Sequence, residues 1–215
     1  MTSDTPQRAR SAEAKQQRER AILDAARALA TARSVREVTL TDVAAAVGLH
    51  KSAMLRYFET REQIFLALAA DEWRDWTEGV RSSWASGPPE VVLARSFVSR
   101  PLFCDLLAHI PLNLERNVSF PSVRSYKRTS LAAVRAVAGD LASREGLSEQ
   151  QAYDVVATAA GLAGALWQMA APGTKLREFY KSEPELAHAV VDVEPRLVRV
   201  LGALIAGFRS PAAAR

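Results

Sequence analysis

The sequence predicts an all-α protein in which a three-helix N-terminal domain precedes a larger helical domain. Apolar residues recur at intervals of three and four along most of the chain, which is the period of an amphipathic helix. Alanine, leucine, valine and arginine dominate, whereas aromatic residues make up 7% of the 215 residues. This balance favours helices over strands. No segment alternates polar and apolar residues as a strand would.

Whole-chain composition restricts the class of protein. Apolar residues make up 48% and the net charge is +4, so a hydrophobic core can form and a nucleic-acid partner is permitted but not required. The single cysteine, Cys104, excludes an internal disulfide and indicates a reducing compartment. The N-terminus lacks an apolar leader, and no apolar run reaches the ~20 residues of a membrane span. We therefore expect a cytoplasmic protein that does not enter a membrane.

The first helix is predicted from Glu13 to about Arg33, because its apolar residues fall on one face. Residues 1–12 lack this periodicity, and we interpret them as a flexible basic tail. Residues 1–36 hold eight basic and four acidic side chains. That excess fits a helix that approaches DNA, and equally a solvated helix face with a few extra arginines.

Two short helices and a tight turn are predicted within residues 39–58, TLTDVAAAVGLHKSAMLRYF. Thr39 is a favourable N-cap, and Asp42, three residues later, completes a capping box. Gly48 suits the left-handed residue that follows a helix end. The second short helix is predicted within KSAMLRYF.

A long fourth helix is predicted from Thr60 to about Ala85. Thr60 and Gln63 form a second capping box, and Gly87-Pro88-Pro89 ends the helix. One face carries an apolar stripe, which consists of Phe65, Leu68, Trp73, Trp76, Val80 and Trp84.

Proline and glycine divide the rest of the chain into further helices. A third capping box, Ser148 and Gln151, begins one of them. The predicted helices are Glu90–Ser99, Leu102–Arg116 with an interruption at Pro111, Ser122–Arg144, Glu149–Ala170 and Pro195–Phe208.

The pattern in residues 39–58 is typical of a helix-turn-helix. Two helices that cross steeply need small residues at the crossing and a glycine at the turn, and this segment has both. The second helix would bury Leu49, Met54 and Phe58 and present its other side chains to the major groove. The alternative is that KSAMLRYF is merely an exposed amphipathic helix.

The same residues resemble the N-terminal signature of the TetR family of transcriptional regulators. That signature has a long amphipathic helix, a threonine-capped second helix, a turn glycine, a short helix of the type S-K-G-x-L-Y-x-H/Y-F, and a fourth helix. This chain has RAILDAARALA, TLTDVAAAVG, LHKSAMLRYF and ETREQIFLAL in that order. The resemblance implies a tail at residues 1–15, a DNA-binding domain at 16–76 and a ligand-binding and dimerisation domain at 77–215.

The resemblance also implies a set of DNA contacts. By position, Lys51 and Tyr57 touch the DNA backbone, and Ser52 and Ala53 approach base edges. The residues assigned to DNA are Thr39, Thr41, His50, Lys51, Ser52, Ala53, Leu55, Arg56, Tyr57 and Arg61, of which the two threonines meet phosphates.

Two of these residues depart from the family pattern. His50 stands where the family prefers a serine N-cap, so it is either a weak cap or a phosphate contact. Leu55 replaces a frequent tyrosine and could contact a thymine methyl group. Both departures obscure the operator sequence.

A ligand site is predicted in the second domain, where the resemblance places a cavity. The Leu102–Arg116 segment combines apolar side chains with a few polar ones, as a small-molecule pocket requires, and Pro111 breaks its helix. An ordinary core with a surface histidine is the alternative. The residues assigned to the ligand are Phe103, Leu107, His109, Ile110, Asn113, Tyr126 and Trp167.

A homodimer is expected, because a two-fold symmetric protein reads a palindromic DNA operator. Small residues on one face of the Glu149–Ala170 helix, among them Gly161 and Gly164, allow close helix approach. The last helix carries an apolar stripe that includes Leu201. Both faces could instead belong to the core of one chain.

These features together predict a repressor that binds double-stranded DNA and is released by a small-molecule inducer. An enzyme is the main alternative, but His50, His109 and His188 are scattered, and no phosphate loop, dinucleotide fingerprint or metal-spaced cluster is present. We therefore expect neither catalysis nor a cofactor nor a metal. A helical adaptor without DNA binding is the third possibility.

Overall fold

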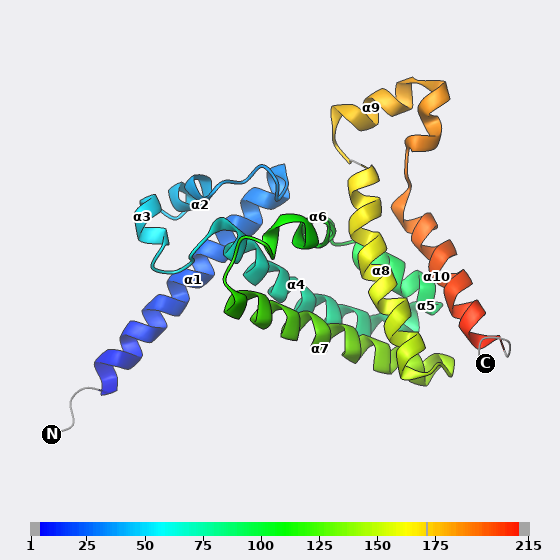
Figure 1. The fold of residues 1–215 in the computed structure, drawn as a ribbon, viewed down its shortest axis with the longest axis horizontal. Coiled ribbons are helices and arrows are strands. Elements are labelled where there is room, and N and C mark those ends of the chain that lie inside the picture. Colours follow the sequence, from blue (N-terminus) through cyan, green and yellow to red (C-terminus); the bar gives the residue numbers. More distant parts are fainter. Residues whose placement is uncertain (1–4, 171, 211–215) are drawn as a thin grey trace.

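The computed structural model describes residues 5–170 and 172–210, and within them every regular element is helical. Figure 1 shows the chain as an elongated set of helices. In chain order they are α1 (Thr5–Arg33), α2 (Leu40–Ala46), α3 (Lys51–Met54), α4 (Arg61–Ser83), η1 (Trp84–Ser86), α5 (Pro89–Val98), α6 (Pro101–His109), η2 (Ile110–Leu114), α7 (Phe120–Glu145), α8 (Glu149–Ala170), α9 (Lys175–Ser182), η3 (Pro184–Ala189) and α10 (Val193–Arg209).

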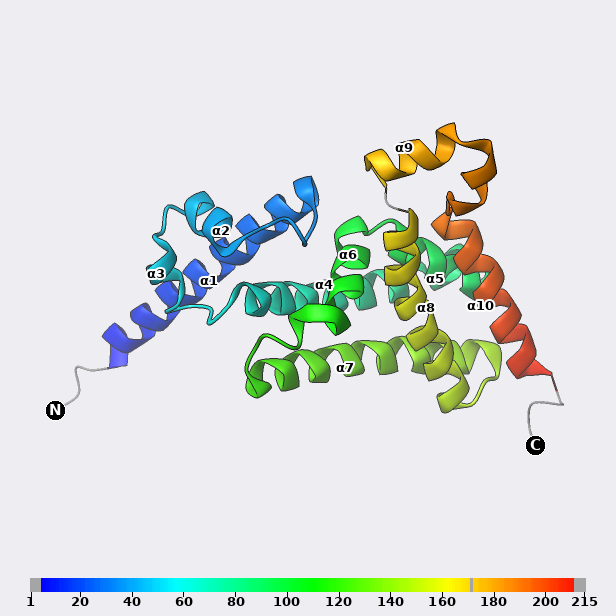
Figure 2. The same cartoon turned by 45° about the horizontal axis from the view of Figure 1, so that its top comes forward.

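The helices form two regions joined by α4. Helices α1 to α3 lie at one end of the molecule, and α8 and α10 lie at the other (Figures 1 and 2). Helices α4 and α7 pack against each other along the middle, and α6 packs on α8. Helix α9 projects away from the body beyond the ends of α8 and α10.

The first short helix forms as predicted. The Thr39 hydroxyl accepts a hydrogen bond from the Asp42 N–H, and the Asp42 carboxylate accepts one from the Thr39 N–H, which completes the capping box. Gly48 has φ +65°, the left-handed conformation expected of it. The second short helix, α3, ends at Met54 and is shorter than the predicted segment, because residues 55–57 continue as a turn.

Two other N-terminal predictions need correction. Helix α1 begins at Thr5 and not at Glu13, so residues 5–12 belong to the helix and not to a flexible tail; residues 1–4 lie outside the described part. At the start of α4, Thr60 caps the N–H of Gln63 as predicted, but the Gln63 side chain accepts a hydrogen bond from the N–H of Glu59 and not from that of Thr60.

The second domain follows the predicted order, with one omission. Helix α8 has the predicted bounds, and the Ser148–Gln151 box is complete in both directions. The break at Pro111 is a turn of π-helix, a local widening that recurs at functional sites. Helix α9 and the short η3 were not predicted from the sequence.

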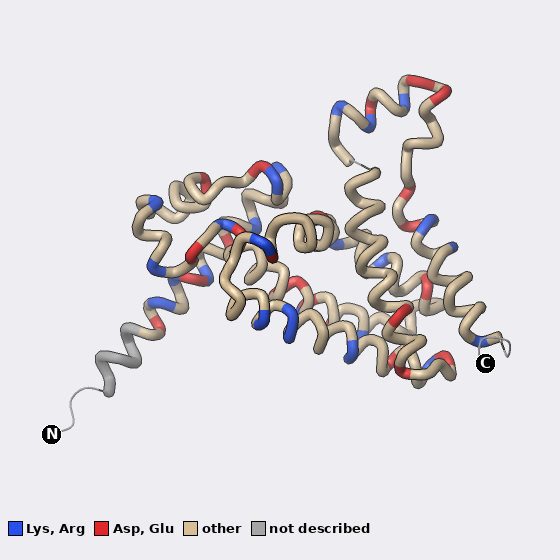
Figure 3. The backbone as a smooth tube through the Cα atoms, viewed as in Figure 1, with Lys and Arg blue, Asp and Glu red and all other residues tan. Residues whose placement is uncertain are grey.

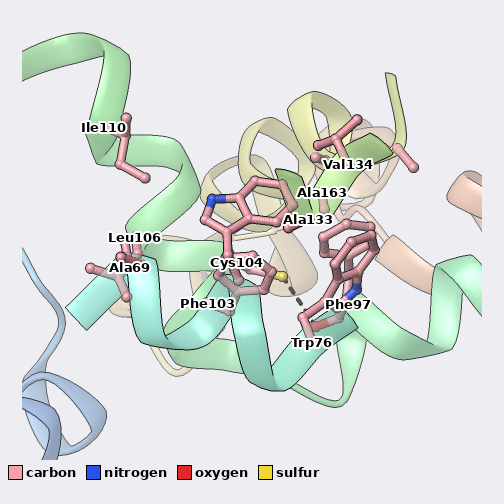
Figure 4. Close-up of a cluster of buried hydrophobic side chains, with 14 of the residues drawn as sticks. Ala69, Trp76, Phe97, Phe103, Cys104, Leu106, Ile110, Ala133, Val134 and Ala163 are labelled. Carbon is pink, nitrogen blue, oxygen red and sulfur yellow. Dashed lines mark hydrogen bonds between the residues drawn. The ribbon is translucent and has the colours of Figure 1, made fainter. Parts of the chain in front are cut away.

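The core of the second domain is built around aromatic rings. Trp76 and Phe97 stack with centroids 4.9 Å apart, and Phe103 lies edge-on to Trp73 at 5.0 Å. Figure 4 shows this cluster, in which the Cys104 thiol donates to the Phe97 carbonyl at 3.2 Å. The apolar stripe predicted on α4 is buried throughout.

The predicted dimer contacts of Gly164 and Leu201 are wrong. Leu201 is fully buried within the chain, where α10 packs on α5 and α8. A Cβ on Gly164 would lie 2.8 Å from the Ala108 backbone nitrogen, so this glycine allows α8 to approach α6 of the same chain. Both residues therefore belong to the core of one protomer.

Replacing Gly164 should destabilise the protein. In Gly164→Ala the new methyl group meets backbone atoms that cannot rotate away, and we expect a loss of ~1–3 kcal/mol in the free energy of unfolding, measured by urea denaturation. Gly139→Ala is the matched control, since no atom lies within 4 Å of that Cβ on α7. It should gain ~0.5–1 kcal/mol. Equal effects of the two changes would contradict the proposed close approach.

Candidate nucleic-acid interface

Helix α3 and the turn after it form the segment predicted to read the major groove, which is called the reading helix below. This segment has one buried and one exposed side. Met54 and Phe58 are buried against the N-terminal core. Leu55, at 56% exposure, is a large apolar side chain left open to solvent. The remaining predicted contacts divide by burial: Thr39, Thr41, His50, Lys51, Ser52 and Arg56 are exposed, and Ala53 and Tyr57 are partly buried.

His50 is a poor N-cap, as its residue type suggested. Its side chain makes no capping hydrogen bond, and its Nδ1 lies 3.2 Å from the Ser52 hydroxyl. The first N–H groups of α3 are therefore not satisfied by a side-chain cap from His50. The exposed Lys51 at this helix start is suited to a phosphate.

Arg61 does not present a free cation. Its guanidinium donates hydrogen bonds to the carbonyls of Val35 and Val38, pairs with Glu62 and lies 4.7 Å over the Phe65 ring. It thus holds the turn between α1 and α2 against α4. In this conformation it acts as a positioning residue for the helix-turn-helix.

The same turn is fixed from the second domain by a buried carboxylate. Ser34 has φ +107°, a strained value for a residue other than glycine. The N–H of Val35 donates to Asp105 on α6 at 2.6 Å. Gln168 on α8 donates to the other oxygen of Asp105 at 2.9 Å. One side chain thereby connects α6 and α8 to the turn after α1.

His109 completes this buried group. Its Nδ1 lies 2.8 Å from the Asp105 carbonyl and 3.4 Å from the Asp105 carboxylate. Hydrogen bonding to Asp105 raises the pKa of His109 against the opposing effect of burial. Burial alone would raise the pKa of Asp105, but the hydrogen bonds from His109 and Val35 outweigh it and lower that pKa. The pair is therefore stabilised as an ion pair.

A second polar contact connects the two regions. Glu72 on α4 is buried and pairs with Arg27 of α1, and Arg100 also lies 3.8 Å from its carboxylate. Asp105, Gln168 and Glu72 were not singled out from the sequence. For Asp105, the available signal in the sequence is an acidic residue within the otherwise largely apolar helical segment PLFCDLLAH.

The residues assigned to a ligand differ in burial, and the three clefts beside α4 do not bring them together. Phe103 is fully buried in the aromatic cluster, and His109 and Ile110 are buried near it, whereas Leu107 and Trp167 are partly buried. Asn113, in the π-turn, has a buried side-chain oxygen without a hydrogen-bond partner among the described residues. Tyr126 alone lines one of the clefts described next.

The described surface carries clefts, three of which lie beside α4. One of about 500 Å³ lies between α1 and α4 and has mostly charged walls. A second, of about 280 Å³, lies between α4 and α5. The third, of about 320 Å³, separates α4 from the start of α7 and reaches from Phe58 to Tyr126. Burial raises the pKa of Tyr126, and the hydrogen bond from Trp73 lowers it. The effect of burial is larger, so this pKa is raised to about 12.

Comparison with known families gives two matches. The profile described as bacterial regulatory proteins, tetR family, matches residues 22–68. The profile described as tetracyclin repressor-like, C-terminal domain, matches residues 70–212. No curated protein sequence matches significantly.

Solved structures share the fold at low identity. The fatty acid degradation regulator FadR from Bacillus halodurans is 13% identical with a TM-score of 0.58, over 88% of this chain and 98% of that one. A TetR/AcrR-family transcriptional regulator from Thermobifida fusca is 16% identical with a TM-score of 0.52, over 90% and 100%. A tetR-family regulator from Streptomyces coelicolor is 17% identical with a TM-score of 0.51, over 89% and 82%. Such likenesses establish a common fold.

The described residues also bear on metal binding and on membrane insertion. No group of three or more His, Cys, Asp or Glu is placed there to hold a metal ion. No single helix there has the length and hydropathy of a membrane span, although the bent pair of α8 and α9 meets those criteria jointly.

The Asp105–His109 pair should make stability depend on pH. The charged form of Asp105 stabilises the fold fully above the usual Asp pKa of 3.8. This stabilisation is lost as the pH falls through the lowered pKa of Asp105. The protonated form of His109 stabilises the fold fully below the usual His pKa of 6.5. This stabilisation is lost as the pH rises through the raised pKa of His109. His109→Gln should therefore cost most, ~1–2 kcal/mol, between about pH 4 and 6.5.

Urea denaturation at several pH values measures this difference. His188→Gln, at an exposed histidine of η3, is the control and should leave the free energy of unfolding nearly unchanged. A pH-independent cost for His109→Gln would show that the ion pair is not the cause.

Proposed function

Because the chain belongs to the TetR family of bacterial transcription regulators, we propose that it represses transcription as a homodimer and leaves its palindromic operator when a small molecule binds the second domain. The DNA-binding domain in this proposal spans residues 16–76, and the ligand-binding and dimerisation domain spans residues 77–215. Its place of action is the cytoplasm, where the operator DNA lies.

One observation carries the proposal for DNA binding. The segment from Lys51 to Arg56 exposes two cations, a hydroxyl and an apolar side chain, while Met54 and Phe58 are buried behind it. Lys51 and Arg56 are suited to phosphates, and Ser52 and Leu55 to base edges. We omit Arg61 from the set of contacts, because its guanidinium is occupied by backbone carbonyls.

The dimer interface is reassigned to the outer faces of α8 and α10. Gly161 and Ala165 are exposed on α8, and Val200, Ala203 and Gly207 are exposed on α10. These small and apolar side chains recur at helical spacing on two neighbouring helices. They would allow the corresponding helices of a second copy to pack closely.

The effector would act by shifting contacts that cross from the second domain to the helix-turn-helix, and the buried Asp105 group is one of them. Helix α6 carries Asp105, and the π-turn that follows it ends α6. A ligand that moves α6 changes the distance between Asp105 and the Val35 N–H, and so shifts the orientation of the reading helix. It does so only by its differential affinity for the two orientations.

We also infer that the chain is not an enzyme. His50 directly precedes α3, His109 ends α6 and His188 lies in η3, so the three histidines do not belong to one site. Burial raises the pKa of the Cys104 thiol to about 12, with a smaller contribution from Asp105, so this thiol is a poor nucleophile.

The DNA contacts can be separated by their salt dependence. Lys51→Ala and Arg56→Ala should weaken operator binding and each reduce the slope of log K against log salt by ~0.9, since each removes one phosphate contact. Arg61→Ala should leave the slope unchanged and lower the free energy of unfolding by ~1–3 kcal/mol, because two carbonyls lose their donor.

Gel shifts and salt titrations with DNA flanking the chain's own gene measure these effects, and Arg135→Ala on α7 is the control. Wild-type protein that binds no such DNA would favour the adaptor alternative. A reduced slope in Arg61→Ala alone would restore the contact first predicted for it.

The interface can be tested at positions that are exposed in the monomer. Ala165→Arg and Ala203→Arg should each produce monomers in light scattering and lose operator binding, because a desolvated charge without a partner costs several kcal/mol. Gly139→Arg, exposed on α7, should remain dimeric. Dimers that survive both substitutions would place the interface elsewhere.

A further inference from the structure

We propose that the cleft between α4 and α7 binds a small amphipathic anion, a molecule with one apolar tail and an anionic head. The inference rests on the proposed function, since it names the class of effector and its location. Of the ligand residues predicted from the sequence, only Tyr126 lines this cleft.

The walls of the cleft suit an apolar tail. On α4 they consist of Leu66, Ala67 and Ala70, and on α7 of Pro121, Ser125 and Tyr126. The volume of about 320 Å³ lies at the lower end of the ~300–1,000 Å³ that is usual for small-molecule sites. Small alanine side chains on one wall leave the space, and hydroxyl groups on the other can bond to a polar head.

The edge of the cleft on α7 is basic. Residues 116–139 include five basic side chains and no acidic one. Four of them lie on α7, where Figure 3 shows several basic positions, and one of these four, Lys127, pairs with Glu115. Arg128 follows Ser125 by three residues and Pro121 by seven, so it lies beside the cleft wall, and Arg124 follows Pro121 by three. Both arginines are exposed and form no ion pair within the described part of the chain. They could therefore attract an anionic head.

The inner end of the cleft reaches the helix-turn-helix. Phe58, the buried residue just after the reading helix, lines it together with Gln63. Ser122 on α7 also lines the cleft. Its hydroxyl accepts from Gln63 at 3.0 Å and donates to Glu59 at 3.0 Å, and Ser119 donates to Glu59 at 2.5 Å. Hydrogen bonds with Ser119 and Ser122 lower the pKa of Glu59, which keeps its carboxylate charged. An occupant would compete with this contact and so bias the position of the DNA-binding domain relative to α7.

Titration calorimetry with n-decanoate, a single-chain carboxylate kept below its micelle concentration, tests the site on the full chain without DNA. Wild-type protein should bind decanoate, and decyltrimethylammonium, which has the same tail and the opposite charge, should not bind. Arg124→Ala with Arg128→Ala should weaken decanoate binding about fivefold, as two partly screened charge pairs allow.

Two further variants separate charge from space. Ala67→Leu fills the apolar wall and should weaken decanoate binding at least tenfold, and circular dichroism and operator binding confirm that it has folded. Arg135→Ala removes an exposed arginine of the same helix, ~10 Å beyond Arg128 along the helix axis, and should bind decanoate like the wild type.

The outcomes decide the proposal. Decanoate binding that depends on charge and on Ala67 supports the site. Absent binding, equal binding of the cationic probe, or binding that neither variant weakens overturns it. Operator binding without decanoate is a separate measurement, so failure of the cleft leaves the repressor function standing, and failure of DNA binding is recognised independently.

Discussion

The orientation of the DNA-binding domain depends on how the turn between α1 and α2 is held. Ser34 has a positive φ there, a conformation that costs ~1–3 kcal/mol and persists only where its surroundings enforce it. Asp105 accepts from Val35, and Arg61 donates to Val35 and Val38. The end of α1 would otherwise leave main-chain groups of this turn without hydrogen bonds. The Val35 N–H is thus bonded to α6, and the carbonyls of Val35 and Val38 are bonded to α4.

The boundary between the two regions differs in kind from the core next to it. Inside the second domain, the ring of Phe97 stacks on those of Trp76 and Phe103. Such close packing opposes movement of the helices relative to one another. At the boundary, Asp105 and Glu72 are buried with directional partners. Hydrogen bonds to a charged group favour a few discrete geometries, so the boundary suits a protein that alternates between two orientations.

Local chemistry decided what could be predicted from the sequence. The boxes at Thr39 and Ser148 involve residues three apart, so they could be recognised without a fold. Val35 and Asp105 are 70 residues apart, and Arg61 is 26 from Val35, so nothing local indicates either contact. For the same reason Leu201 was placed at an interface: an apolar stripe predicts burial but does not identify what covers it.

Helix α9 and η3 have no buried residue. Arg177 of α9 connects this segment to the body, because its guanidinium donates to the carbonyls of Ala170, at the end of α8, and Val191, just before α10. The entropy of closing a loop grows slowly with its length, by ~0.6 kcal/mol for each doubling. Insertions or deletions within residues 178–189 would therefore leave the core intact, which makes this segment the natural place for the chain to acquire a new length or a fused peptide.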